Sequence, residues 1–263
     1  MTQRYPVEAV IALVRQAGRA IMAVYASDFA VEHKDDRSPL TAADRAAHDV
    51  LDAGLVALAD GLPVLSEESA VIDWQVRQTW PRYWLVDPLD GTREFVKRNG
   101  EFTVNVALVE QGAPVFGVVQ APVTGELWWG GGSIGAYRRE TDGTDTPLAS
   151  ARPAPARLRV AASRSHLDAR TQALLRKLGE HDRLGLGSSL KFCRLAEGSA
   201  DIYPRFGPTS EWDTAAAQCV LEGAGGCVID TQGRPLRCNQ GPSLLNSDFL
   251  ALGDPSLPWS TWL

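Results

Sequence analysis

What this chain can fold into is limited most strongly by residues 83 to 95, YWLVDPLDGTREF. Tyr83 to Val86 are aromatic, aliphatic and β-branched, which predicts a buried strand. Pro88 is predicted to end that strand, because proline has no N–H group to donate within a sheet. Asp87 and Asp90 then lie at the carboxyl end of the strand, and two neighbouring buried carboxylates need a positive partner.

The segments before this strand read as helices. Apolar residues recur at helical spacing from Val7 to Tyr25 and predict a helix with one buried face. Thr41 is predicted to cap a second helix that runs to Leu58, with Asp44 completing a capping-box-like pattern. Val64–Leu65 is predicted to be a short strand. The polar segment EHKDDRSPL between the two helices is predicted to be a loop.

Strands dominate the next segment, and helices alternate with strands after it. Four strands are predicted in FTVNVALVEQGAPVFGVVQAP, GELWWGGG and IGAYRRE. The connector TDGTDTPLASARPAPAR predicts a domain boundary near residue 150. Beyond it we expect strands in LRVAAS, ADIYPR and CVID, and helices over His166–Leu178, in SSLKFCRLAEG and in WDTAAAQCVLEGAGG. The predicted fold class is α/β, with layers of helices and sheets.

Charge and cysteine usage exclude several classes of protein. The net charge of −6 leaves no global basic character to attract nucleic acid. The four cysteines form no CxxC pair and are predicted to be buried or partly buried free thiols of a cytosolic protein. No apolar run approaches the ~20 residues of a membrane span, and the first residues lack the pattern of a signal peptide. We therefore expect a cytoplasmic protein, at most in peripheral contact with a membrane.

Acidic residues recur at the predicted ends of helices and strands. Taken singly, Asp44 reads as a helix cap, Glu67–Glu68 as a solvated pair and Asp213 as a partner of a helix dipole. Taken together with Asp87 and Asp90, they form a set of hard oxygen ligands without a nearby His–Cys set, which favours Mg²⁺ over zinc. Two such ions ~3.5–4 Å apart clamp a phosphate and activate water.

Gly91 and Thr92 follow these aspartates directly and offer backbone N–H groups and a hydroxyl to an oxyanion. The motifs SEES, DPLDGT and EWDTAAA occur in an order that resembles the inositol monophosphatase superfamily of Mg²⁺-dependent, lithium-sensitive phosphatases. Within it the chain is most similar to 3'(2'),5'-bisphosphate nucleotidases of the CysQ type, over nearly its whole length. The resemblance implies a layered αβαβα sandwich. Ala217 departs from the pattern, because glycine is expected after WDTAA.

The resemblance also implies roles for individual residues, with two or three Mg²⁺ ions in the site. The first metal would be bound by Glu67, Asp87 and the backbone carbonyl of Leu89, and the second by Asp87, Asp90 and Asp213. Asp44 and Thr92 would orient and deprotonate the attacking water, and Glu68 would stand behind the ligands. Residues 89 to 92 would contact the scissile phosphate. Metal ligands and nucleotide contacts together form the predicted substrate site: Glu67, Asp87, Leu89, Asp90, Gly91, Thr92, Ser163, Ser189, Lys191, Arg205 and Asp213.

The substrate that the resemblance implies is adenosine 3',5'-bisphosphate, hydrolysed to AMP and phosphate in connection with sulfate assimilation. A nucleoside bisphosphate carries a second anion, and Lys191 and Arg205 suit its recognition; the alternative is that both are solvated surface charges. Two rivals stay open. One is a phosphatase of the same fold acting on inositol monophosphate or fructose 1,6-bisphosphate, and the other is an inactive nucleotide sensor. The oligomeric state is left open, with a monomer favoured.

We also expect the functional residues to be divided between two parts of the chain. Residues 1–150 are predicted to form an α+β half that carries most metal ligands. Residues 151–263 are predicted to form an α/β half that carries Asp213 and the contacts to the nucleotide.

Overall fold

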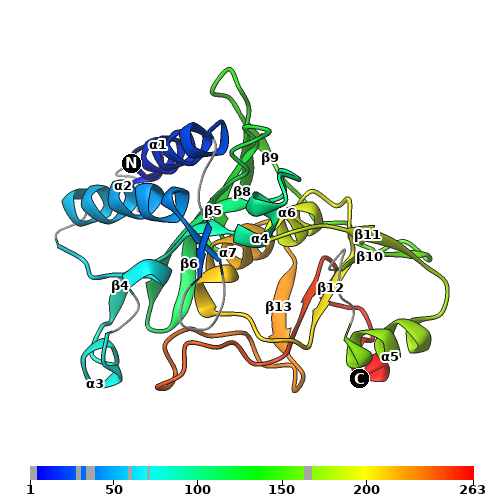
Figure 1. Ribbon diagram of the computed structural model, residues 1–263. Helices are drawn as coiled ribbons and strands as arrows, with labels where there is room; N and C mark the ends of the chain where they lie inside the picture. The colour runs from blue at the N-terminus through cyan, green and yellow to red at the C-terminus, as the bar shows by residue number, and fades with distance from the viewer. Residues whose placement is uncertain (1–4, 28–30, 34–38, 59–60, 70–71, 163–167) are drawn as a thin grey trace.

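The structure is a computed structural model of the 263-residue chain that describes all residues except 1–4, 28–30, 34–38, 59–60, 70–71 and 163–167. Helices and sheets stack in five layers, in the order helix, sheet, helix, sheet, helix (Figure 1). The predicted αβαβα sandwich is therefore confirmed. Within the described residues, no helix is long and apolar enough to cross a membrane.

The larger sheet has seven strands in the order β3-β4-β5-β6-β7-β8-β9. β3 is parallel to β4, and all other neighbours in this sheet are antiparallel. Its strands are β3 (Val64–Ser66), β4 (Arg82–Asp90), β5 (Thr103–Glu110), β6 (Ala113–Gln120), β7 (Leu127–Gly131), β8 (Gly135–Arg139) and β9 (Asp145–Pro147).

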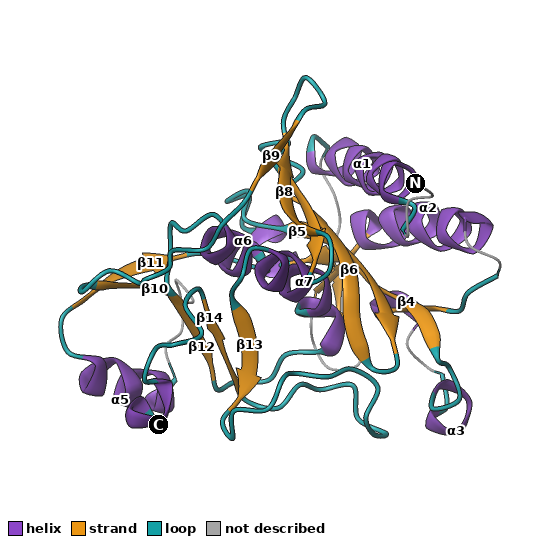
Figure 2. Cartoon of the chain, turned by 180° about the vertical axis from the view of Figure 1, so that it is seen from behind, coloured by secondary structure: helices purple, strands orange, loops and turns teal. Residues whose placement is uncertain are grey.

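Two long helices, α1 (Val7–Tyr25) and α2 (Ala42–Leu58), cover one face of this sheet (Figure 2). Both occur as predicted, since their periodic apolar residues pack on the strands and bury that stripe. α2 is preceded by a two-stranded ribbon of β1 (Val31–His33) and β2 (Pro39–Thr41), which the loop prediction missed.

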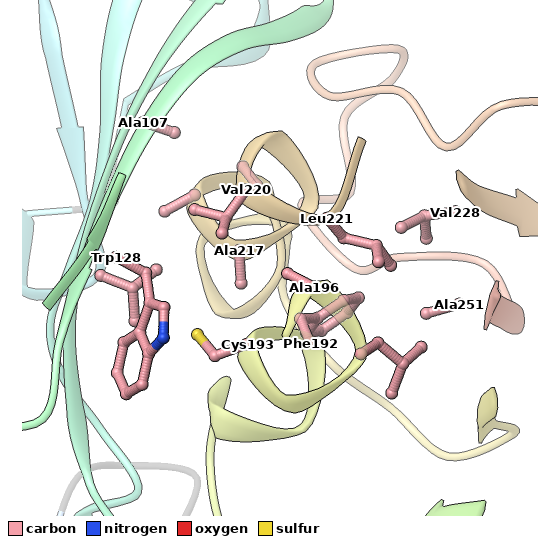
Figure 3. Packing of buried hydrophobic residues seen from close by; sticks show 14 of the residues in the cluster. Ala107, Trp128, Phe192, Cys193, Ala196, Ala217, Val220, Leu221, Val228 and Ala251 are labelled. Carbon is pink, nitrogen blue, oxygen red and sulfur yellow. The ribbon is translucent and has the colours of Figure 1, made fainter. Parts of the chain in front are cut away.

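The central layer consists of α6 (Leu190–Ala196) and α7 (Ala215–Gly223), packed between the two sheets (Figure 3). Gly117 in β6 lets α7 approach closely, because a Cβ atom there would lie 2.3 Å from the Ala216 carbonyl oxygen. Ala217, where glycine was expected, is buried in this layer and is accommodated as part of the core.

The smaller sheet has the order β11-β10-β12-β14-β13, and α5 (Ala169–Leu178) covers its outer face. Its strands are β10 (Leu158–Ala162), β11 (His181–Gly185), β12 (Ile202–Arg205), β13 (Cys227–Asp230) and β14 (Phe249–Leu252). The remaining elements are short: η1 (Glu67–Ser69), α3 (Trp74–Arg77), α4 (Thr92–Val96), η2 (Glu211–Asp213) and η3 (Trp259–Trp262). The prediction of free cysteines is confirmed.

The prediction that Pro88 ends its strand is wrong. β4 continues to Asp90, with a register shift against β5 between Asp87 and Asp90. The parallel neighbour β3 pairs only as far as Val86, so the proline lies beyond that ladder and at an irregularity in the other. Strands β9, β11 and β14 were also missed. The predicted start of α5 at His166 lies outside the described residues, and its N-cap is Asp168.

Candidate active site

Three aspartates from distant parts of the chain meet at the carboxyl end of β4. One carboxylate oxygen from each of Asp87, Asp90 and Asp213 lies within 4.8 Å of the others. Asp87 is buried, whereas Asp90 and Asp213 are partly exposed. The irregularity in β4 spaces the first two, and η2 delivers the third.

Backbone N–H groups fix each of the three carboxylates. Asp87 Oδ1 accepts from the Leu89 N–H at 3.0 Å, and Asp90 Oδ2 accepts from the Ser189 N–H at 2.6 Å. Asp213 Oδ2 accepts from the Ser210 N–H at 2.9 Å. Because one oxygen of each group is held, the set is organised before any ligand arrives.

The electrostatics of this cluster call for positive charge. Burial, followed by the charges of Glu67 and Asp90, raises the pKa of Asp87 well above its usual value. Burial raises the pKa of Asp90 to about 6, although Lys191 opposes the shift, and burial with the charge of Asp90 raises the pKa of Asp213 to about 8. The negative charges of these carboxylates repel one another. Clustered carboxylate oxygens of this kind fit a divalent cation, which would neutralise them.

A cavity of about 410 Å³ opens over the cluster. Glu67, Leu89, Gly91 and Thr92 line it together with the aspartates, so the structure brings these predicted residues together. Gly91 has a φ of 91°, in the left-handed region that favours glycine, and this turn leads directly into α4 at Thr92.

Asp44 is both a helix-start residue and a neighbour of this cavity. Its Oδ2 accepts hydrogen bonds from the Thr41 N–H at 2.8 Å and the Thr41 hydroxyl at 2.7 Å. Its Oδ1 lies 3.4 Å from the Thr92 hydroxyl, which is also 3.4 Å from the Leu89 carbonyl oxygen. Burial raises the pKa of Asp44 to about 6. The cap and the catalytic interpretation therefore use different oxygens of the same carboxylate.

A second cavity, of about 280 Å³, adjoins the first. The two share Asp90, Gly91, Arg93, Glu94, Arg205 and Asp213. Lys191 is buried in its wall, 5.1 Å from the centre of the Tyr203 ring. Burial lowers the pKa of Lys191 to about 8, and its ammonium group donates to the Ser188 carbonyl oxygen at 2.6 Å.

Ser189, a predicted nucleotide contact, lines neither of the two cavities. Its buried hydroxyl lies 2.8 Å from both the Thr103 hydroxyl and Asn105 Oδ1, while its N–H holds Asp90. Ser189 therefore stands behind the site and not on its wall. Ser163 lies outside the described residues.

Two cationic side chains that were not predicted line the second cavity. Arg93 lies in α4 and Lys97 is the C-cap of that helix, and Arg93 lines both cavities. Their signal was present in the sequence, because residues four apart in a helix that starts beside the aspartates project to the same side.

The comparisons with known proteins agree with this geometry. The family model described as the inositol monophosphatase family matches residues 3–254. The chain belongs to the inositol monophosphatase family. This family is metal-dependent, and the three clustered aspartates could bind a metal ion.

Two curated relatives carry the same name, 3'(2'),5'-bisphosphate nucleotidase CysQ. The one from Shigella flexneri is 52% identical over 239 residues, 90% of this chain and 95% of the relative. The one from Escherichia coli strain K12 is 51% identical over 241 residues, again 90% and 95%. The crystal structure of CysQ from Bacteroides thetaiotaomicron superimposes with a TM-score of 0.80 at 40% identity, covering 93% of this chain and 96% of that one.

Proposed function

We propose that this member of the inositol monophosphatase family is a Mg²⁺-dependent nucleotidase that hydrolyses adenosine 3',5'-bisphosphate to AMP and phosphate. The observation that carries the proposal is the pairing of an acidic cavity, whose aspartates could hold a metal ion, with an adjoining cavity lined by Lys191 and Arg205. A substrate with two separate phosphates fits this pair. The relatives named as bisphosphate nucleotidases support the same substrate class.

Asp87, Asp90 and Asp213, with Glu67 and the Leu89 carbonyl, would hold two or three Mg²⁺ ions. When bound, these ions supply positive charge to the phosphoryl group and lower the pKa of water. The aspartates contribute by fixed geometry, since each is held by a backbone N–H group.

Asp44 and Thr92 handle the proton of the attacking water. The Thr92 hydroxyl donates toward Asp44 Oδ1, which leaves its lone pairs to accept from water at the cavity wall. The 3'-phosphate would lie beside Gly91 and Thr92 for in-line attack, without a phosphoenzyme. Catalysis then consists mainly of positioning and charge neutralisation.

The second phosphate selects the substrate. Lys191 in the cavity wall and Arg205 at the boundary of the two cavities supply cationic donors at a distance from the acidic cluster. A sugar monophosphate has no group for these donors.

The test is phosphate release by the purified protein with Mg²⁺, measured side by side on adenosine 3',5'-bisphosphate, inositol monophosphate and fructose 1,6-bisphosphate. We expect the highest kcat/KM on the nucleotide and inhibition by lithium or calcium. A preference for either sugar phosphate would assign the chain to a different activity of this fold. Absence of Mg²⁺-dependent release from all three would favour a sensor.

Replacing Lys191 by Ala is expected to raise KM for adenosine 3',5'-bisphosphate by ~10–100-fold, the scale of one charge-assisted hydrogen bond. The KM of a sugar monophosphate should change by less than about threefold, because that substrate has no second phosphate for Lys191 to bind. Steady-state kinetics on both substrates with the same preparation provide the internal control. An equal loss on both would remove Lys191 from phosphate recognition.

Mg²⁺ is expected to raise Tm by roughly 5–10 °C at pH 8.5, as a ligand bound well above its Kd does for a chain of this size. The gain should be smaller at pH 6. The folded-state pKa values of Asp90 and Asp213, about 6 and about 8, lie above those of the unfolded chain. Their stabilising contribution without metal is therefore present at low pH and is lost as pH rises through those values.

Thermal unfolding of chelator-treated protein with and without Mg²⁺, at both pH values and with NaCl at matched ionic strength, measures this difference. An identical Tm with and without Mg²⁺ at pH 8.5 would contradict metal binding by the cluster.

We propose a cytoplasmic enzyme whose two halves divide near residue 150, with a monomer favoured. The free cysteines support a reducing compartment. In the described residues, the strands of the larger sheet end at Pro147 and those of the smaller sheet begin at Leu158, which supports the boundary.

A further inference from the structure

Arg77, the last residue of α3, is only 1% exposed. Charged side chains are rarely buried to this extent unless they have partners. Its guanidinium donates to Asn239 Oδ1 at 2.5 Å, to the Gly241 carbonyl oxygen at 3.0 Å and to the Pro242 carbonyl oxygen at 2.5 Å. The Asn239 side-chain amide donates back to the Arg77 carbonyl oxygen at 2.7 Å. Arg77 thus fixes a segment 162 residues further along the chain.

That segment, residues 239–246, holds η2 in place by hydrogen bonds. The Asn239 N–H donates to Glu211 Oε1 at 2.8 Å, and the Glu211 N–H donates to the Leu244 carbonyl oxygen at 2.9 Å. Asn246 Nδ2 donates to the Ser210 carbonyl oxygen at 2.7 Å. Since η2 is a single short turn that ends at Asp213, its position depends on these outside contacts.

Glu211 completes the same connection. Glu211 is 4% exposed, and its Oε1 accepts from the N–H group of Asn239, whose side chain accepts from Arg77. Arg77 Nε and Glu211 Oε2 have no hydrogen-bond partner within the described part of the chain. The two side chains are therefore linked through Asn239 and not by a direct hydrogen bond.

The connection joins two groups of candidate metal ligands. α3 lies in the link between η1, which begins with Glu67, and β4, which ends in Asp90. α3 and the loop that follows β13 lie at the same end of the molecule (Figures 1 and 2). Arg77 thereby ties the segment that carries Glu67 and Asp90 to the turn that carries Asp213.

We propose that Arg77 is a positioning residue for the metal site, acting through Asn239 and Glu211 to hold Asp213 in register with Asp87 and Asp90. This inference rests on the proposed function. Metal ligands must be held within ~0.5 Å of their working geometry, and removal of an outer hydrogen-bond partner typically weakens metal binding by ~10–100-fold.

The test is the Mg²⁺ dissociation constant, measured by titration calorimetry on metal-free protein, together with kcat as a function of Mg²⁺ concentration. Two variants address different links. Arg77→Met removes the guanidinium, whereas Asn239→Gly removes only the bridging amide and keeps the backbone, because Asn239 has a left-handed φ of 56° that glycine adopts readily. Arg82→Met is the control, since Arg82 is a partly exposed arginine that pairs with Glu110.

We expect both Arg77→Met and Asn239→Gly to raise the Mg²⁺ Kd by ~10-fold or more, with kcat recovering at saturating Mg²⁺. A merely structural role would lower the folded fraction and leave the Kd of the folded protein unchanged. Wild-type affinity in folded Asn239→Gly and Arg77→Met would overturn the inference, as would an equal loss in Arg82→Met. A wild-type protein that binds no Mg²⁺ would overturn the proposed function itself, and this inference with it.

Discussion

Replacing Asp90 by Asn is expected to lower kcat for adenosine 3',5'-bisphosphate by ~10³-fold or more, the scale of losing a principal electrostatic stabiliser. Asp90 lies in the three-aspartate cluster and lines both cavities, so its charge acts on the metal site and on the phosphate together. Asparagine keeps the size of the side chain and one acceptor oxygen for the Ser189 N–H group. The loss should therefore reflect charge, with the fold retained.

The measurement is single-turnover phosphate release at saturating Mg²⁺, with circular dichroism to confirm folding. Asp182→Asn is the control, since Asp182 is an exposed carboxylate in β11 that pairs with Arg157 at the surface. Near-normal turnover in Asp90→Asn under these conditions would remove Asp90 from the site.

Replacing Asp44 by Asn is expected to lower kcat by ~10²–10⁴-fold, the range for a positioned general base. Thr92→Val should cause a loss of similar size, because the hydroxyl connects the water to Asp44 Oδ1. Residues that act as one unit are not additive, so the double variant should be no slower than the worse single variant. This pattern separates proton handling from two independent structural defects.

Asp49→Asn provides the control on the same helix, because Asp49 is exposed and lines neither cavity. Asp44 also accepts two hydrogen bonds from Thr41, so its variant should lose some stability, and Tm must be measured alongside kcat. Losses in the double variant that multiply would contradict a shared role.

Local periodicity and turn chemistry were sufficient for much of the fold. α1 was predicted to the residue because its apolar stripe is regular and long. β11 was missed for a different reason. β11 carries charged residues such as Asp182 and Arg183 on its exposed positions, and its strand state depends on pairing with β10 and not on its own composition.

The continuation of β4 through Pro88 likewise depends on the pairing of neighbouring strands and not on local composition. Proline argues against a strand when judged alone, but here the neighbouring strand has already ended. Only the pairing of strands, which the sequence does not display, reveals that the chain can remain extended. The irregularity that results sets the spacing of Asp87 and Asp90.

Motif order allowed the site residues to be nominated, but not their surroundings. Asp87, Asp90 and Asp213 were identifiable because each lies beside a predicted strand end or helix start. Arg77 was not, because a buried arginine in a four-residue helix has no periodicity around it. The direction of the Ser189 hydroxyl, toward Thr103 and Asn105, was not predictable, since it depends on the backbone direction.

The short outer strands of the two sheets have a consequence for association between molecules. β3 and β9 each have three residues, β9 ends in Pro147, and β11 carries charges. Unpaired strand borders invite other chains to add on and aggregate, and brevity, proline and charge each discourage that. The described part of this chain therefore gives a second polypeptide little backbone to extend, which favours a protein that stays dispersed at high concentration.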